Sequence, residues 1–340
     1  MATLETRPLT QAVLTRMRTP ILYLFLLCFA AQSGVATLCA SVQLPKTSAA
    51  ILVQQSGDDS ITLTVTVTNK QGALIGGLSR SDFSVFEGKT PLDITSFSFG
   101  DEPMSIGIVY DKSQVEGEYS RRGVATSKTL RQALERFVKL SNSSNTYFLI
   151  HVPKEPQVLV DWTRDHDALL RPLDNLKTER EAALYDACFM AVEKLHKGEH
   201  SKRVLLVISD GSDSRSRRSY QELRRLLMNA DTLVYGIATH DEHAIRQADA
   251  LGIGASAILD ELSSVTGGGT FYPKNNLDLV AAAELLAGEL RQQYRITCKP
   301  ASSKADKKLR ALKVKVTSPS SAPRELRNLL VRSRRGYYPV

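Results

Sequence analysis

The stretch MSIGIVYDKSQV, Met104–Val115, begins with a near-continuous apolar run, Met104–Tyr110. An acid, Asp111, and a hydroxyl residue, Ser113, follow this run. Such a run, without the alternation of a half-exposed strand, is typical of a strand buried on both faces of a parallel sheet. A second run, KRVLLVISDGSD, reaches an acid at Asp210. Because ligands of these sheets bind at the carboxyl ends of the strands, Asp111, Ser113 and Asp210 are candidate ligands of a divalent cation, which prefers oxygen atoms. The alternative is that the acids cap helices or order the loops.

Strands and helices alternate from about residue 104 to residue 290. Apolar residues with helical spacing occur in segments 126–141, 181–195 and 219–230. Runs predicted to be buried strands lie between or after them: NTYFLIHV, the shorter QVLVDW, and DTLVYGIAT. This order predicts βαβ units around a doubly wound, mostly parallel sheet, which is the α/β class. In such a sheet Asp111 and Asp210 can be neighbours.

The segments on either side of this region have the pattern of β-strands instead. Over 51–100, Ile61, Leu63, Val65 and Val67 alternate with threonines, as in a strand with one buried face. Residues 82–99 are predicted to form two further strands, again with alternation. Residues 291–340 also contain strand-like runs: YRITCKP, RALKVKVTS and a final strand, LLVRSRRGYYPV. We therefore predict one β-sandwich-like domain built from both segments, with the α/β domain, 103–290, inserted between them.

The charge is unevenly distributed. Residues 291–340 contain 14 Lys or Arg and 2 Asp or Glu, a net charge of +12. Residues 1–40 contribute +2 to the total of +8, which leaves −6 for residues 41–290. A basic segment can bind nucleic acid or anionic lipid. We expect a solvated strand face or contact with the acidic body instead, and no nucleic-acid partner.

The first 40 residues have the order of a secretory signal. Arg16 and Arg18 precede the apolar run Ile21–Ala31, and small residues follow it. The run is shorter than the roughly 20 residues that span a bilayer. We predict a signal peptide over 1–40, a linker over 41–50, and an exported protein that is periplasmic, secreted or at the cell surface. An uncleaved anchor is the alternative, and it is the one way in which we expect this chain to contact a membrane.

Two of the four cysteines, Cys188 and Cys298, lie outside the signal region. One lies on the apolar face of a predicted helix and the other in a strand of a different segment. We therefore expect two buried thiols rather than a disulfide.

Several stretches together resemble a known family. VLLVISDGSDSRSR, ALYDACFMAVEKL and YDKS are similar to segments of the von Willebrand factor type A (VWA) domain. Residues 50–340 as a whole resemble the VWFA-related family of bacteria, of acidobacterial type. Three further stretches carry this resemblance: the β-rich stretch that begins at VTVTNKQG, the segment LSSVTGGGTFYP, and the C-terminal stretch VRSRRGYYPV. The resemblance implies a Rossmann-like sheet with a metal-ion-dependent adhesion site on its top face. It also implies a role in protein–protein interaction or cell adhesion.

In the family that the chain resembles, this site uses an Asp-x-Ser-x-Ser loop, a threonine from a second loop and an aspartate from a third. Asp111 and Ser113 match the first loop, and Asp210 matches the third. Val115 and Ala182 stand where hydroxyl ligands belong. The resemblance thus implies a degenerate site, at which Mg²⁺ or Mn²⁺ binds weakly or not at all. Three oxygen-bearing residues of the second loop stay open as ligands: Thr178, Glu179 and Glu181.

Three hypotheses of function follow, and the sequence predicts no oligomeric state. The first is an exported, non-catalytic protein whose VWA top face contacts a protein partner, with the basic stretch 215–219 at the rim. The second is a structural scaffold of an envelope assembly, with a vestigial top face. The third, a metal-dependent enzyme, rests on His240 and His243 alone, because no Gly-rich phosphate loop, Cys-x-x-Cys pair or Gly-x-Ser-x-Gly elbow is present.

Overall fold

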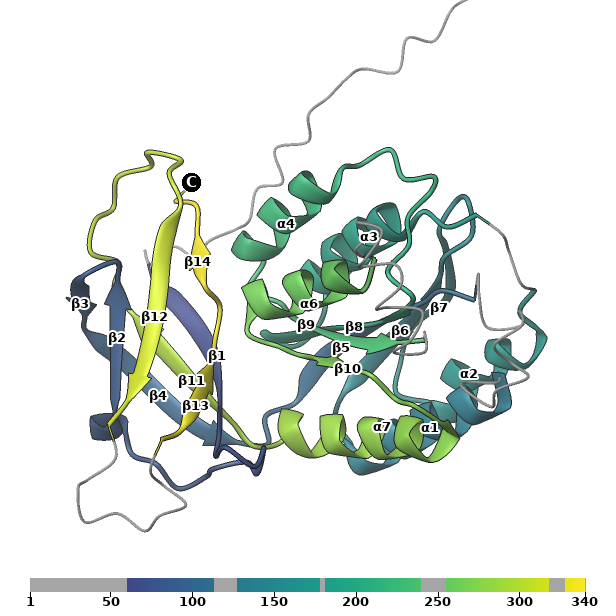
Figure 1. Ribbon diagram of the computed structural model, residues 1–340, viewed down its shortest axis with the longest axis horizontal. Helices are drawn as coiled ribbons and strands as arrows, with labels where there is room; N and C mark the ends of the chain where they lie inside the picture. Colours follow the sequence, from purple (N-terminus) through teal and green to yellow (C-terminus); the bar gives the residue numbers. More distant parts are fainter. Residues whose placement is uncertain (1–59, 113–126, 178–180, 240–254, 318–327, 340) are drawn as a thin grey trace, which may run out of the picture. The chain divides into compact units, whose positions relative to one another are not determined.

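The computed structural model describes residues 60–112, 127–177, 181–239, 255–317 and 328–339 (Figure 1). All of them belong to the unit formed by residues 52–340. The predicted signal peptide and linker lie outside the described residues, as do the first nine residues of the predicted N-terminal β segment, 51–59. Among the described helices, none combines the length and the apolar composition that crossing a bilayer requires.

A six-stranded sheet in the order β10-β9-β8-β5-β6-β7 forms the centre of the α/β domain. All neighbouring strands are parallel except β7, which is antiparallel to β6. Every residue of the central strand β5 is buried, as its continuous apolar run predicted. The strands are β5 (Met104–Tyr110), β6 (Thr146–His151), β7 (Gln157–Thr163), β8 (Lys202–Ser209), β9 (Leu233–Ala238) and β10 (Thr270–Phe271).

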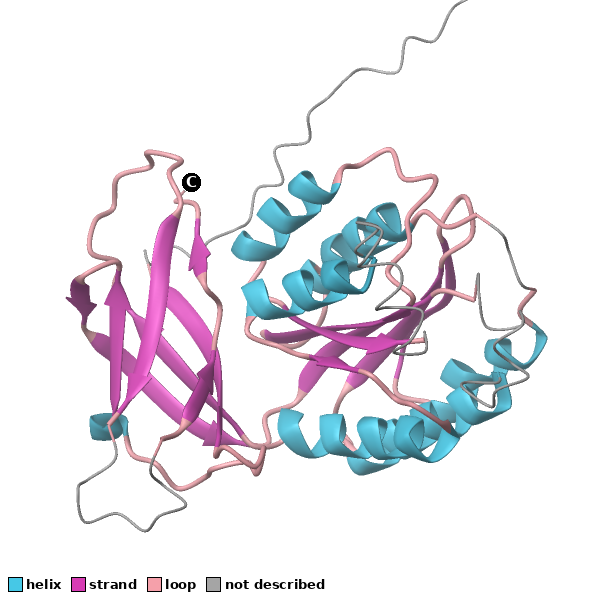
Figure 2. Cartoon of the chain, in the orientation of Figure 1, coloured by secondary structure: helices cyan, strands magenta, loops and turns pink. Residues whose placement is uncertain are grey.

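Helices cover both faces of this sheet, so the predicted α/β, doubly wound class is confirmed (Figures 1 and 2). On one face, Ile106, Ile108 and Tyr110 belong to a core that includes Phe137 of α1 and Leu286 of α7. The opposite face is covered by α3, α4 and α6. The helices are α1 (Ser127–Leu140), α2 (His166–Leu170), α3 (Leu184–His196), α4 (Tyr220–Asn229), α6 (Ala255–Thr266) and α7 (Asn276–Leu290), with a 3-10 helix η3 (Arg171–Asn175) after α2.

Two four-stranded sheets, in the orders β13-β1-β11-β4 and β14-β12-β2-β3, form the sandwich-like domain. Strand β1, which precedes the α/β domain, pairs antiparallel with β11, which follows it, and Leu63 lies opposite Ile296. Strand β2 pairs with β12 in the same way. Both flanking segments therefore contribute to each sheet, and the α/β domain is inserted between them as predicted. The strands are β1 (Ile61–Thr68), β2 (Phe83–Glu87), β3 (Thr90–Leu92), β4 (Ile94–Gly100), β11 (Gln293–Cys298), β12 (Arg310–Val316), β13 (Leu330–Arg332) and β14 (Gly336–Tyr337), with a 3-10 helix η1 (Arg80–Asp82) before β2.

Three strand predictions were wrong in detail. The run 82–99 forms three strands rather than two, because β3 and β4 flank Asp93 and belong to different sheets. The final run, predicted as one strand, contains β13 and β14, which likewise pair in different sheets. Strand β7, predicted as buried, is a half-exposed edge strand, with Val158 43% exposed. Alternation and apolar content identify a strand but do not show where the chain crosses between sheets.

Cys188 and Cys298 are both free and buried, which confirms the two predicted thiols. Burial raises the pKa of Cys188 to about 12 and that of Cys298 to about 11. Both therefore stay protonated at neutral pH, and neither is a reactive thiolate.

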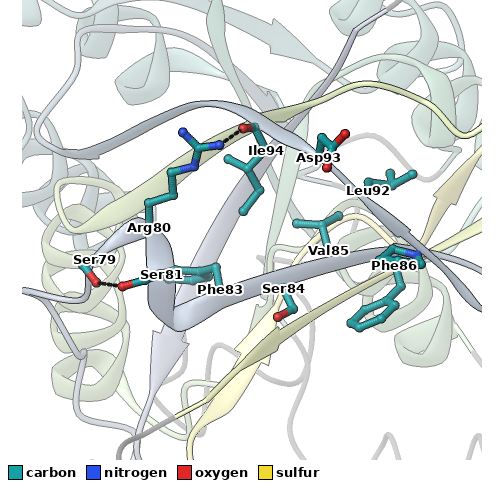
Figure 3. Close-up of a pocket in the computed structure, with 11 residues that line it drawn as sticks. Ser79, Arg80, Ser81, Phe83, Ser84, Val85, Phe86, Leu92, Asp93 and Ile94 are labelled. Carbon is teal, nitrogen blue, oxygen red and sulfur yellow. Dashed lines mark hydrogen bonds between the residues drawn. The ribbon is translucent and has the colours of Figure 1, made fainter.

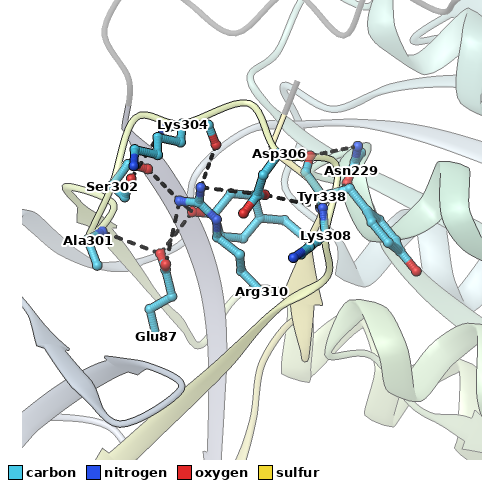
Figure 4. A network of polar contacts seen from close by, with 10 residues as sticks. Glu87, Asn229, Ala301, Ser302, Lys304, Asp306, Lys308, Arg310 and Tyr338 are labelled. Atoms are coloured by element: carbon cyan, nitrogen blue, oxygen red, sulfur yellow. Dashed lines mark hydrogen bonds and ion pairs between the residues drawn. The ribbon is translucent and has the colours of Figure 1, made fainter.

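The described part of the basic C-terminal segment is folded against acidic side chains. Arg332 pairs with Glu289 at 2.5 Å, and Arg310 pairs with Glu87 at 3.5 Å. Figure 4 shows how Arg310 also donates to backbone oxygens of the loop that precedes β12. This arrangement agrees with the prediction that the segment contacts the acidic body, because these guanidinium groups are already paired within the chain.

A glycine allows this segment to approach the α/β domain closely. Gly267 has φ +95°, and a Cβ there would lie 2.6 Å from the carbonyl carbon of Ser333. Only glycine takes this conformation easily and leaves the space open. One residue further along, Arg334 is buried and donates to the backbone oxygens of Thr62 and Met228. The end of the chain is thus bonded both to the sandwich and to the α/β domain.

Candidate functional site

Asp111 and Asp210 lie at the same end of adjacent parallel strands. The N–H of Asp111, just past β5, donates to the oxygen of Ile208 in β8 over 2.9 Å. Asp210 follows the last residue of β8. Both are buried, with 2% and 4% of their surface exposed. The structure thus brings the two acids together at the top face, where the strand-end rule placed them.

A serine that the sequence analysis did not single out completes the contact between these strand ends. The hydroxyl of Ser209 donates to Oδ2 of Asp111 over 2.8 Å and accepts the N–H of Gly211 over 3.0 Å. Oδ1 of Asp210 accepts the N–H of Ser212 over 2.7 Å. The turn at Gly211 has φ +85°, which glycine adopts without strain. Both carboxylates therefore take part in ordering the third loop.

Ala182, at the position of the missing hydroxyl, is fixed to the third loop through its backbone. Its N–H donates to Oγ of Ser214 over 3.1 Å. Its carbonyl oxygen accepts the N–H of Ser214 over 2.9 Å and that of Arg215 over 3.1 Å. The second and third loops are thus joined by main-chain bonds that require no metal ion. The methyl group of Ala182 itself offers no oxygen.

The third loop also caps helix α3, which has no capping side chain of its own at Ala183. The N–H of Tyr185 donates to Oδ2 of Asp213 over 2.9 Å, and the N–H of Asp186 donates to Oγ of Ser216 over 3.0 Å. These bonds satisfy donors that a helix start leaves unpaired. Burial, and secondarily the carboxylate of Asp213, raises the pKa of Tyr185 to about 12, so its hydroxyl stays neutral.

Helix α3 in turn provides acceptors for backbone N–H groups of the third loop. Oδ2 and Oδ1 of Asp186 accept the N–H groups of Arg217 and Arg218, each over 3.0 Å. Oδ1 of Asp213 accepts the N–H of Ser216 over 3.1 Å. Together with the bonds to Ala182, these contacts fix every backbone N–H from residue 214 to residue 218.

Asp213→Ala should lower the free energy of unfolding by about 1–2 kcal/mol, the usual effect of losing a helix cap and its associated hydrogen bonds. Urea unfolding followed by the fluorescence of Trp162 measures this change. Asp93→Ala is the matched control, since Asp93 is exposed on the sandwich and should change stability by less than about 0.5 kcal/mol. Equal effects of the two variants would contradict the capping role.

Charged side chains surround the loop. Arg215 pairs with Glu181, and this contact, reinforced by Lys154, holds the pKa of Glu181 below its usual value. The guanidinium of Arg218 lies over the ring of Phe189, 4.8 Å from its centroid. Lys112, next to Asp111, is buried and donates from Nζ to the oxygen of Leu176, so it helps to hold the segment before the second loop. The basic stretch 215–219 was expected at the rim of the top face, but the individual contacts of these lysine and arginine side chains were not predicted from the sequence.

The remaining predicted site residues lie outside the described part of the chain: Ser113, Val115, Thr178, Glu179, His240 and His243.

The described donors do not fit a complete metal site. Asp111 and Asp210 offer carboxylate oxygens suited to a hard cation. However, the methyl side chain of Ala182 offers no oxygen ligand. Within the described ranges, no group of three or more His, Cys, Asp or Glu side chains is arranged to hold a metal ion. We therefore assign no chemical step to a bound ion.

A separate pocket of about 580 Å³ lies on the sandwich and not at the top face (Figure 3). Its polar groups contact one another: the hydroxyls of Ser79 and Ser81 are 2.8 Å apart, and Arg80 donates to the oxygen of Ile94. No convergent set of groups for catalysis lies among its lining residues. The lining residues are Ser79, Arg80, Ser81, Phe83, Ser84, Val85, Phe86, Pro91, Leu92, Asp93 and Ile94.

A doubly wound sheet with acids at the ends of two central strands defines an α/β domain of the Rossmann-like class. Within that class, residues 106–212 match the sequence profile of the von Willebrand factor type A domain. The chain is therefore a VWA-domain protein, as its sequence motifs indicated. Its membership of the acidobacterial-type subgroup stays a prediction.

Comparison with solved structures finds other proteins of low identity. The conserved hypothetical protein BatB from Bacteroides thetaiotaomicron is 12% identical, with a TM-score of 0.42, over 56% of this chain and 97% of that chain. The vWF domain of the type V pili tip protein Mfa5 from Porphyromonas gingivalis is 12% identical, with a TM-score of 0.43, over 55% of this chain and 94% of that chain. The PilB minor pilin from Streptococcus sanguinis is 11% identical, with a TM-score of 0.40, over 56% of this chain and 62% of that chain. Comparison with curated proteins finds no match.

Proposed function

We propose that this chain is an exported, non-catalytic binding protein whose VWA top face contacts a protein partner. The observation that carries the proposal is the third loop, in which main-chain and side-chain bonds to α3 and Ala182 fix each N–H from residue 214 to residue 218. A loop fixed before binding loses little conformational entropy when a partner docks. A rigid scaffold that carries polar loops is also the usual arrangement of a binding surface.

A non-catalytic role agrees with the burial of the two acids. Asp111 and Asp210 are 2% and 4% exposed. Oδ2 of Asp111 accepts the hydroxyl of Ser209, and Oδ1 of Asp210 accepts the backbone N–H of Ser212 in the third loop. These bonds support a role of the two acids in ordering the loops rather than in contacting a substrate.

A degenerate metal site predicts weak cation binding. Calorimetric titration of the purified chain with Mg²⁺ or Mn²⁺ should give a dissociation constant weaker than about 1 mM, because Mg²⁺ gives up its water ligands reluctantly and Ala182 supplies no oxygen in exchange. Asp111→Asn and Asp210→Asn keep the shape of the site and serve as controls. A micromolar dissociation constant that either variant abolishes would overturn the proposal of a degenerate site.

One observation favours a second function, that of a structural scaffold. Glu289 at the end of α7 binds Arg332 of β13 and Tyr235 of β9, and thus links the two domains. A rigid link of this kind suits a protein that holds others at a fixed distance. In that case the top face would be vestigial.

Capture of partners from an envelope extract by the immobilised chain separates the two functions. Ser212→Tyr places a large, uncharged side chain on the exposed third loop and leaves the backbone bond of Ser212 to Asp210 in place. Ser84→Tyr makes the same change on an exposed position of the sandwich. The top-face function predicts that only Ser212→Tyr loses the partner, while retention of every partner by Ser212→Tyr favours the scaffold.

A further inference from the structure

The charge that a partner meets at the top face differs from the charge buried beneath it. The acids at the centre, Asp111 and Asp210, are buried. The described parts of the loops around them expose four positively charged side chains, on Lys154, Arg215, Arg217 and Arg218. Residues 41–290 as a whole have a net charge of −6, so these cations stand out from the body that bears them.

The acids near these cations are largely engaged within the chain. Asp186 accepts two backbone N–H groups of the loop, and Asp213 accepts N–H groups of Tyr185 and Ser216. Glu181 is paired with Arg215. Two acids near these cations are exposed: Glu155, beside Lys154, and Glu222, which accepts the N–H of Ser219 and whose pKa is lowered mainly by that bond and, to a lesser extent, by Arg218. Among the described residues of these loops, the exposed cations therefore outnumber the exposed acids.

Lys154 belongs to the same group of cations as the three arginines. The oxygen of Pro153, directly before it, accepts the N–H of Ala183 over 3.2 Å. Its ammonium is also near enough to lower the pKa of Glu181, after the larger effect of Arg215. The first residues beyond β6 and the third loop are thus both hydrogen-bonded to the second loop, at Ala183 and Ala182 respectively.

The arginines are presented from a fixed backbone. The N–H groups of Arg215, Arg217 and Arg218 are bonded to Ala182 and Asp186. The guanidinium of Arg218 is further held over the ring of Phe189. Arginine presents a planar fork of donors that binds a carboxylate through two parallel bonds. Three such forks on a rigid loop form a surface for several carboxylates.

From these observations we infer that the third loop recognises an acidic protein segment through Arg215, Arg217 and Arg218. This inference rests on the proposed binding function and names the chemistry of the partner. A carboxylate of the partner can replace Glu181 on Arg215 and meet Arg217 directly. Attraction between the positive rim and an acidic segment also accelerates encounter, and added salt weakens it.

Fluorescence anisotropy with a fluorescein-labelled oligo-glutamate peptide tests the inference on the full chain. The variant R215Q/R217Q/R218Q removes the three charges and keeps long polar side chains. It should bind the peptide at least about tenfold more weakly than the parent chain, since charge pairs at close range contribute strongly to affinity. Affinity of the parent chain should fall as salt is raised.

The variant K304Q/K307Q/K308Q is the matched control. It removes three exposed positive charges from the loop before β12, so the net charge changes equally. It should bind within about twofold of the parent chain, because these charges lie on the sandwich. Equal losses in the two variants, or no loss in the arginine variant, would overturn the inference. Tighter binding of a labelled oligo-thymidylate than of the peptide would also overturn it, since phosphate would then be the preferred anion.

The outcome remains distinguishable from failure of the proposed function. If Ser212→Tyr loses the captured partner while the R215Q/R217Q/R218Q variant retains both partner and peptide, the binding function stands and the inference of an acidic partner segment is wrong. If Ser212→Tyr retains every partner, the binding function itself fails. Circular dichroism of each variant confirms that the comparison is made between folded chains.

Discussion

Glu289→Ala should lower the free energy of unfolding by about 3 kcal/mol. Glu289 is 9% exposed. Its Oε1 accepts one hydrogen bond from the hydroxyl of Tyr235 and one from Nη2 of Arg332, each over 2.5 Å. Removing the carboxylate leaves a guanidinium and a buried hydroxyl without their acceptor. Loss of one partner from a buried ion pair destabilises by about 3–5 kcal/mol, and we take the lower value because the side chain of Arg332 is 35% exposed.

The position of this carboxylate explains why its loss affects more than one element. Gln293, at the start of β11, donates from Nε2 to the hydroxyls of Thr66 and Tyr235, each over 3.0 Å. These residues come from β1 of the sandwich and from β9 of the α/β domain. Burial, and secondarily the charge of Glu289, raises the pKa of Tyr235 well above its usual value, so the phenol remains a donor. The network therefore couples the unfolding of the two domains.

Glu284→Ala is the matched control, on the same helix. Glu284 pairs with Arg136 at 2.6 Å, but its side chain is 38% exposed. Exposed pairs contribute about 0–1 kcal/mol, so this variant should change stability little. Urea unfolding monitored by circular dichroism and by Trp162 fluorescence compares the variants. If Glu289→Ala is no more destabilising than Glu284→Ala, the buried network does not stabilise the junction.

The sequence predicted the class of the fold because burial on both faces leaves a simple pattern. The runs that became β5 and β8 contain no alternation, and both are buried throughout or nearly so. The insertion was also predictable, since period-2 strands occur only outside 103–290. What the pattern does not contain is the partner of each strand. β3 and β4 are separated by Asp93 alone and still pair in different sheets, because sheet packing decides where the chain crosses over.

The candidate site was predictable to the same extent. Strand ends placed Asp111 and Asp210 together, because parallel strands bring their carboxyl ends to one edge. The contacts of Asp213 and Ser216 with α3 were not predictable, since each joins residues about 30 positions apart through one hydrogen bond. Those contacts gave the third loop its fixed shape, so the feature on which the proposed function rests came from the structure.

Lys202→Met should change the pH dependence of stability between about pH 8 and pH 10.5. Lys202 is 4% exposed, and its Nζ donates to the oxygen of Leu290, the last residue of α7, over 2.7 Å. Burial is the main cause that lowers the pKa of Lys202 from 10.5 to about 8. The negative charges of Glu102 and Asp101 act against this lowering, and the positive charge of Arg295 adds to it. The folded chain thus releases this proton at a lower pH than the unfolded chain does.

The sign follows from proton binding in the two states. Below about pH 8 both states bind the proton, and the full unfavourable free energy of burying the charge is present. Between about pH 8 and pH 10.5 the unfolded state binds more protons, so the free energy of unfolding rises with pH. The fall in the pKa of Lys202 from 10.5 to about 8 corresponds to about 3 kcal/mol over the whole window. In Lys202→Met this rise is absent.

The difference between parent and variant isolates this single group. Burial raises the pKa values of Cys188 and Cys298, which lowers stability above about pH 9, but both thiols are present in both chains and their effects cancel. Urea unfolding at a series of pH values measures this difference. Between pH 7 and pH 10, the free energy of unfolding of the parent chain should rise by about 2–3 kcal/mol relative to that of Lys202→Met. Lys139→Met removes an ammonium that is 60% exposed and should give a nearly constant difference. A constant difference for Lys202→Met as well would mean that its charge is not buried in solution, and that the end of α7 is held by packing and the Glu289 network without an ammonium at Leu290.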